Sequence, residues 1–208
     1  MVSIRVVEGS ATDVHSGLAQ LVVPSGARVS GAIADALVSV DADEHSRRGA
    51  WGLGGVEQLG LLDALMCLPT GVPVPVADLG EIGRWHLRGA PAGCVEWLPD
   101  GLVRRLLVPV CSVQLVLVRA TSWRSALRRA AEFEPFASRV VLLERPARKL
   151  ADVQWEADAA GVGLWVQQPD GQISELVPPE GFVRRFVKPG GWRFTERAYT
   201  AWISARNR

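Results

Sequence analysis

The sequence predicts an α/β protein, with a mixed β-sheet flanked by helices and a helical region before it. Two kinds of segment carry this prediction, and they alternate along the second half of the chain. Apolar or alternating runs typical of strands occur at 93–98, 102–108, 113–119, 139–143 and 162–166. Apolar residues three and four positions apart predict helices at 122–136, 150–160 and 195–205.

The first 92 residues have a different character, with fewer strands expected. The elements predicted there are a strand at 3–7, helices at 29–40 and 56–68, and one or two short helices at 76–88. Residues 41–49 (DADEHSRRG) are polar and charged and predict a break between subdomains. The resulting division is an N-terminal subdomain at 1–48, a helical region at 49–92 and an α/β domain at 93–208.

Composition narrows the class of protein. The chain has 208 residues, of which 48% are hydrophobic, and this is enough for one large domain or two small ones. The first residues do not have the pattern that predicts a secretion signal, so none is expected, and the longest apolar stretch, 106–118, is too short to span a membrane. Three cysteines, Cys67, Cys94 and Cys111, lack metal-ligand spacing, so we interpret them as buried free thiols. A cytoplasmic protein without a membrane partner is expected.

Charge is distributed unevenly although the net charge is only +1. The first 46 residues contain two basic and six acidic residues, whereas 100–150 contains ten basic and four acidic residues. Residues 184–208 contain seven basic residues and one acid. Such clustering favours a polyanionic partner, with DNA the first candidate among nucleic acids. The alternative is a solvated face whose arginines pair with the acidic N-terminal third.

A short formula occurs three times: Pro, an acid, Gly, and then apolar residues that end at another Pro. The three copies are WLPDGLVRRLLVP (97–109), QQPDGQISELVPP (167–179) and PPEGFVRRFVKPG (178–190). Pro-acid-Gly favours a tight turn, and the apolar residues that follow predict a strand. The turn does not need the paired arginines Arg104-Arg105 and Arg184-Arg185. If their strands lie close together, they form one anion-binding face.

The order of elements from 113 to 178 is strand, helix, strand, helix, strand, turn, strand. This order, with SVQLVLVRATSWRSALRRAAEFEPFASRVVLLE at its centre, resembles the restriction-endonuclease-like PD-(D/E)XK fold. In that family an Asp and a Glu hold Mg²⁺, and a Lys positions the attacking water. Here the Glu position falls on Leu117 and the Lys position on Arg119. The resemblance therefore implies a relative without the catalytic motif, whose fold serves binding and needs no cofactor.

A second resemblance concerns the middle of the chain. The helix at 56–68, the segment VADLGEIGRWHLRGAPAGCVEW and the hairpin at Pro99-Asp100-Gly101 are similar to a winged helix. That resemblance makes the hairpin the wing and implies a short recognition helix carrying Arg84, His86 and Arg88. Alternatively, the same hairpin forms the first two strands of the nuclease-like sheet.

These observations predict a non-catalytic nucleic-acid-binding protein. The candidate phosphate contacts are Arg104, Arg105, Arg119, Arg124, Arg128, Arg184 and Arg185. Trp192 either stacks on a base or packs the last helix onto the sheet. The rival interpretation is a protein-interaction or assembly module, with a second copy as one partner. A third is a metal-dependent nuclease whose carboxylates are displaced to Glu132, Glu134 or Glu144. No metal ligand set is assigned, and we expect binding rather than catalysis.

Overall fold

The structure is a computed structural model that describes residues 20–29, 32–183 and 188–206. The described chain forms two compact units, and we describe each by itself. Unit 1 contains residues 20–39, 113–183 and 201–206, and unit 2 contains residues 40–112 and 188–200. The units therefore do not follow the three consecutive segments into which the sequence was divided. The strand predicted at 3–7 lies outside the described residues.

Unit 1 is built on a mixed six-stranded sheet, which confirms the predicted α/β class. The strands are β1 (Gln20–Val29), β2 (Ala32–Val40), β6 (Cys111–Ala120), β7 (Ser138–Leu143), β8 (Gly163–Gln167) and β9 (Ile173–Val177). Their order across the sheet is β1-β2-β6-β7-β8-β9. The strands β6, β7 and β8 are parallel, while β1 with β2 and β8 with β9 are antiparallel pairs.

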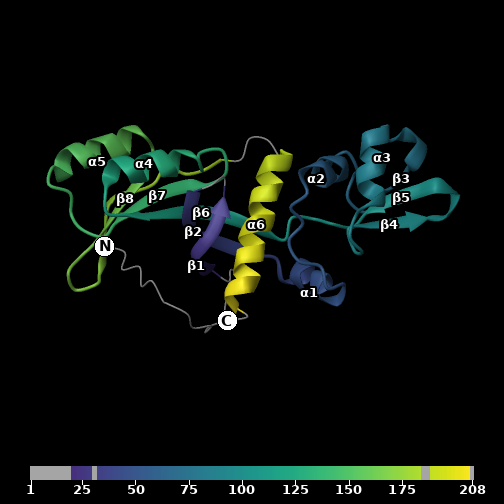
Figure 1. The fold of residues 1–208 in the computed structure, drawn as a ribbon, viewed down its shortest axis with the longest axis horizontal. Helices are drawn as coiled ribbons and strands as arrows, with labels where there is room; N and C mark the ends of the chain where they lie inside the picture. The colour runs from purple at the N-terminus through teal and green to yellow at the C-terminus, as the bar shows by residue number, and fades with distance from the viewer. Residues whose placement is uncertain (1–19, 30–31, 184–187, 207–208) are drawn as a thin grey trace. The chain divides into compact units, whose positions relative to one another are not determined.

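Two helices, α4 (Trp123–Ala131) and α5 (Leu150–Ala159), connect the parallel strands and lie on the same face of the sheet (Figure 1). Successive parallel strands joined by right-handed crossovers require this placement. Helix α4 packs against β7, and α5 packs against β8 and β9. The indole Nε1 of Trp123 donates to Glu156 Oε2 at 2.7 Å, which ties the two helices together. The other face of the sheet buries Leu117, Val140 and Trp165.

Two predictions in the N-terminal third are wrong. The segment expected as a helix at 29–40 instead forms strand β2 over 32–40, because its antiparallel pairing with β1 overrides the helical spacing of its apolar residues. The expected break at 41–49 is helix α1 (Ala42–Ala50). Asp41 caps it, because its Oδ1 accepts hydrogen bonds from the backbone N–H groups of Asp43 and Glu44 at 3.0 and 2.9 Å.

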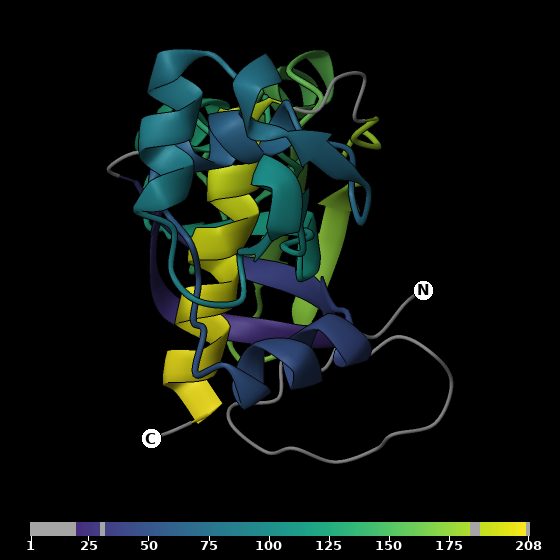
Figure 2. The same ribbon diagram turned by 90° about the vertical axis from the view of Figure 1, so that its right-hand side faces the viewer.

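Unit 2 consists of short helices around a three-stranded antiparallel sheet. Its elements after α1 are α2 (Leu59–Met66), β3 (Pro73–Pro75), η1 (Val76–Asp78), α3 (Glu81–Arg88), β4 (Val95–Leu98), η2 (Pro99–Gly101), β5 (Leu102–Arg105) and the first part of α6 (Pro189–Arg206). The sheet order is β3-β5-β4, and α2 and α3 pack against each other (Figure 2). Because β4 and β5 belong to this sheet, the hairpin does not supply strands to the sheet of unit 1.

The repeated formula is a turn followed by a strand in its first two copies, as predicted. In the first copy, Asp100 and Gly101 have φ values of 60° and 71°, and β5 follows. In the second, the N–H of Gly171 donates to the carbonyl of Gln168 at 2.9 Å, and β9 follows. Residues 184–187 of the third copy lie outside the described residues.

Helix α6 begins earlier than expected, at Pro189 rather than near Thr195. Proline suits a first helical position, where its missing N–H costs nothing. The Thr195 hydroxyl is not a cap; it donates to the carbonyl of Trp192 at 2.8 Å inside the helix. Among the helices described, none is long and apolar enough to cross a membrane.

A buried ion network in unit 2 holds α1 to α6. The fully buried Arg48 donates from Nη1 to Glu196 Oε2 at 2.6 Å and from Nε to Glu44 Oε1 at 2.8 Å. Burial by itself would lower the pKa of Arg48, but the two carboxylates outweigh it and the pKa is raised. Burial would likewise raise the pKa of Glu44, yet hydrogen bonds from Arg47 and Arg48 lower it below its ordinary 4.5. Both shifts favour the charged forms of Glu44 and Arg48 near neutral pH.

Candidate anion-binding site

A cleft of about 560 Å³ opens in unit 1 beyond the carboxyl ends of the three parallel strands. Arg119 comes from the end of β6, Glu144 and Arg145 follow β7, and Gln167 and Gln168 come from the end of β8. This edge is where ligands bind in open α/β sheets, because loops and helix N-termini converge there. The size of the cleft is also within the range of small-ligand and nucleotide sites.

Arg119 is held in place by a carboxylate on the neighbouring strand. Its Nε donates to Asp35 Oδ2 at 2.7 Å, while Asp35 is buried and Arg119 is 42% exposed. The other oxygen of Asp35, Oδ1, is buried and lacks a hydrogen-bond partner among the described residues. The pair thus fixes a partly exposed guanidinium at the wall of the cleft. Five nitrogen-bound hydrogens in a planar fork make that group suited to phosphate and carboxylate oxygens.

Two helices begin at the same edge of the sheet. Helix α4 starts three residues after β6 ends, and α5 starts seven residues after β7 ends. Neither has a side-chain hydrogen bond at its N-cap, Ser122 or Lys149. The first N–H groups of a helix have no partner within it, and the peptide dipoles place partial positive charge there. Both helix starts therefore favour an anion at the edge where the cleft opens.

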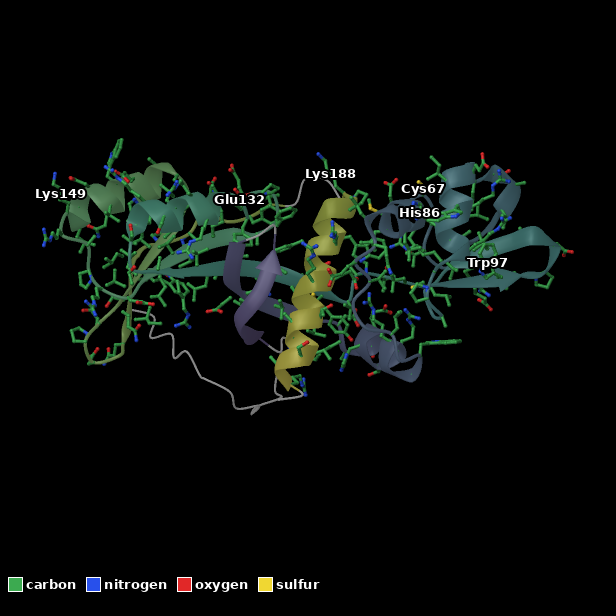
Figure 3. All side chains as sticks on the ribbon, in the orientation of Figure 1. Cys67, His86, Trp97, Glu132, Lys149 and Lys188 are labelled. Atoms are coloured by element: carbon green, nitrogen blue, oxygen red, sulfur yellow. The ribbon has the colours of Figure 1, made fainter. Side chains whose placement is uncertain are left out.

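Basic side chains surround these helix starts. Arg124 is exposed in the first turn of α4, and Arg145, Arg148 and Lys149 are exposed in the loop before α5. Lys149, labelled in Figure 3 at the start of α5, lies 4.0 Å from Asp152. Arg124, Arg145 and Arg148 form no ion pair with any described residue. Unpaired arginines are available for an external anion.

Of the predicted phosphate contacts, Arg119 and Arg124 lie at this edge. Arg128 is exposed one turn further along α4. The neighbouring Arg129 donates from Nη2 to the Arg119 carbonyl at 3.2 Å, which ties α4 to the end of β6. The pair Arg184-Arg185 lies outside the described residues.

Two predicted phosphate contacts, Arg104 and Arg105, lie in unit 2 instead. Arg104 forms an ion pair with Glu96 at 2.8 Å, across the β4–β5 ladder. Arg105 is half-buried, donates to the carbonyl of Leu107 at 2.8 Å, and stacks 4.6 Å over the ring of Trp192. Burial lowers the pKa of the Arg105 guanidinium.

Trp192 belongs to the core of unit 2. It is only 2% exposed, and its Nε1 donates to Glu196 Oε1 at 2.8 Å. Of the two alternatives drawn from the sequence, the structure gives Trp192 a packing position and leaves no open ring face for a base. Arg105 is engaged in the same structural contact.

The displaced carboxylates do not converge. Glu144 lines the cleft, whereas Glu132 is exposed at the end of α4 (Figure 3) and Glu134 lies 3.7 Å from Arg139. Over the described ranges, no group of three or more His, Cys, Asp or Glu side chains is placed to hold a metal ion. At the position that corresponds to the family's Glu, the buried Leu117 offers no oxygen ligand.

Sequence reasoning missed Asp35, Arg145 and Arg148. Asp35 was assigned to a helix, so its position beside Arg119 could not be foreseen. Arg145 and Arg148 had a usable signal, because they follow a predicted strand and precede a predicted helix. Residues in that position gather at the carboxyl edge of a parallel sheet.

Comparisons of the chain with protein-family models, with curated proteins and with solved structures gave no match.

Proposed function

We propose that this chain is a non-catalytic nucleic-acid-binding protein whose phosphate-binding surface is the carboxyl edge of the unit 1 sheet. The observation that carries the proposal is the set of unpaired arginines, Arg124, Arg145 and Arg148, beside two uncapped helix starts. A phosphate there would accept hydrogen bonds from guanidinium groups and would lie near the positive ends of both helices. DNA is the favoured ligand. The cleft beside Arg119 would bind one phosphate group or an unpaired nucleotide at the end of a DNA strand.

Binding rather than cleavage is proposed because the described residues place no group of three or more His, Cys, Asp or Glu side chains to hold a metal ion. The resemblance to the PD-(D/E)XK fold would place a metal-binding carboxylate where Leu117 stands. Asp35, the carboxylate on the adjacent strand, is already neutralised by Arg119. Arginine in place of lysine also keeps its proton at all physiological pH values, so it serves as an anchor for an anion.

The decisive experiment is fluorescence anisotropy with labelled duplex and single-stranded DNA across a salt series. The test variant is R124A/R145A, which removes two unpaired arginines from the edge. The matched variant is R84A/R104A, which removes two arginines from the winged-helix-like surface of unit 2. We expect R124A/R145A to weaken binding and to make the slope of log K against log salt shallower by about 0.9 per lost contact. The matched variant should bind as the wild type does.

Each other outcome has a defined meaning. Equal binding by wild type and R124A/R145A would overturn the proposed surface. Loss of binding in R84A/R104A alone would move the interface to the hairpin and α3 of unit 2. Shortening of the DNA when Mg²⁺ is added would replace binding with metal-dependent cleavage. Absence of binding at low salt would favour the protein-interaction interpretation.

A further inference from the structure

Helix α3 of unit 2 has an unusual outward face. Its inward side is packed, since Leu87 is 1% exposed and the His86 ring lies against Gly60 of α2. On the other side, Ile82 and Trp85 are 76% and 71% exposed. This exposure is unfavourable, because a tryptophan and an isoleucine side chain gain free energy when their apolar surface is removed from water. Such a pair on a rigid helix indicates a contact with another molecule.

Two opposite charges flank this apolar pair. Glu81 and Arg88 are both exposed and stand seven residues apart, which is two helical turns and the same side of the helix. Trp85 lies between them on that side. Neither Glu81 nor Arg88 forms an ion pair with a described residue. The face therefore reads acid, apolar, base from one end of α3 to the other.

This pattern is complementary to itself. If two copies of α3 pack antiparallel about a two-fold axis, Glu81 of each copy meets Arg88 of the other. Trp85 and Ile82 of one copy then pack against Trp85 and Ile82 of the other copy, at the centre of the interface. A two-fold contact requires such self-complementarity, because each side offers the same patch.

We propose that the outward face of α3 is a docking surface for a second copy of this chain, and that the helices pair antiparallel through Trp85, Glu81 and Arg88. A DNA groove fits the face less well. The segment that resembles a winged helix, residues 56–108, contains six acids and four arginines. On this face of the helix, Glu81 would repel phosphates and Ile82 and Trp85 would not bind them, which leaves Arg88 alone to attract them. The proposal stands independently of nucleic-acid binding at unit 1.

The expected dimer is weak and reversible. Two eight-residue helices bury less than the roughly 1,200–2,000 Å² of a standard interface, so we expect dissociation constants of about 10–100 µM. Sedimentation equilibrium on the full chain, over about 5 to 300 µM, covers this range. The wild type should shift from monomer to dimer across it.

Charge exchange tests the geometry. The single reversals E81R and R88E should each leave the protein monomeric, since like charges then meet across the axis. The combined variant E81R/R88E should dimerise again, because the exchanged charges are complementary once more. W85A should be monomeric, and E132R, a reversal at an exposed position in unit 1, should dimerise as the wild type does. Circular dichroism melts verify that each variant is folded.

The proposal is overturned if the wild type stays monomeric throughout the range. It is also overturned if W85A still dimerises, or if E81R/R88E stays monomeric while it melts as the wild type does. In the last case the surface would fit a partner whose charges are not those of α3 itself. Because all readouts are molecular masses, failure here leaves the DNA-binding result of R124A/R145A unaffected.

Discussion

At the scale of single residues, the environments of the three cysteines differ more than their spacing indicated. Cys67 is exposed, which corrects the interpretation of all three as buried, whereas Cys94 and Cys111 are buried. Burial raises the pKa of the Cys94 thiol to about 11. The Cys111 Sγ donates to the carbonyl of Thr195 at 3.2 Å. Only the thiolate reacts with alkylating reagents, so burial and the raised pKa should make the Cys94 thiol slow to react, whereas the exposed Cys67 thiol is accessible.

We therefore expect one fast-reacting thiol in the native protein at pH 8. Iodoacetamide should modify Cys67 within minutes, while Cys94 should react only as the protein unfolds. Peptide mass spectrometry after timed quenching identifies the modified residue. The variant C67S should show no fast phase, and a fast phase that survives in C67S would contradict the assignment.

The buried ion network predicts a dependence of stability on acid. Because the pKa of Glu44 is lowered by folding, the folded chain binds a proton at lower pH than the unfolded chain does. The stabilisation is therefore present above the ordinary pKa of 4.5 and is lost as the pH falls below it. E44Q should cost about 1–3 kcal/mol at pH 7 and reduce the loss of stability between about pH 5 and 3.

Urea denaturation at a series of pH values measures this effect. D43N is the matched variant, since Asp43 is exposed in the same helical turn and its carboxylate pairs with no described residue. The Glu44 explanation fails if E44Q and wild type lose stability with the same slope.

At the scale of elements, the loop before α2 approaches α6 closely at one glycine. A β-carbon on Gly55 would lie 2.6 Å from the Glu196 carbonyl oxygen, and closer still to the Thr200 hydroxyl. A β-carbon on Gly54 would meet nothing within 4 Å. We expect G55A to lower the free energy of unfolding by at least about 2 kcal/mol, and G54A to change it by less than about 0.5. Thermal and urea denaturation of both variants measure the difference; equal stability would contradict the close approach.

A helix or strand is predictable from the sequence when local periodicity determines it, and is not when pairing with a distant segment determines it. Strands β6 to β9 and helices α4 and α5 follow from local periodicity, so they were predictable. The β2 segment has helical spacing, and only its pairing with β1 makes it a strand. Helix α1 did carry a local signal, Asp41 followed three residues later by Glu44, which is a capping pattern. The charge of this segment, taken alone, predicts a break between subdomains instead.

The residues of the candidate site likewise fall into those that the sequence predicted and those that it did not. Arg119 and Arg124 were predicted, because the carboxyl ends of parallel strands can be located from the order of elements. The role of Asp35 depended on a strand that was assigned as a helix. Arg105 and Trp192 show the opposite failure, since clustering of charge and aromatic residues cannot distinguish a basic surface from a buried cation–π contact. Burial is a property of the tertiary structure, and one sequence does not reveal it.

At the scale of the whole molecule, the order of the chain differs from its arrangement in space. Strands β2 and β6 are hydrogen-bonded neighbours in the unit 1 sheet, yet about seventy residues of unit 2 separate them in sequence. Within unit 2, the N–H of Asp41 donates to the carbonyl of Val110 at 2.8 Å. The two ends of this long insertion therefore meet.

That meeting of ends has a consequence for the order of folding. If β2 and β6 paired first, they would have to restrict a long flexible loop, and its closure entropy would oppose them. If residues 41–110 fold first, Asp41 and Val110 are already adjacent, and β2 and β6 can then pair without closing a long flexible loop. Residues 41–110 would then act as a preformed connection between β2 and β6, and a change that slows the folding of this segment should delay assembly of the sheet while leaving the finished sheet intact.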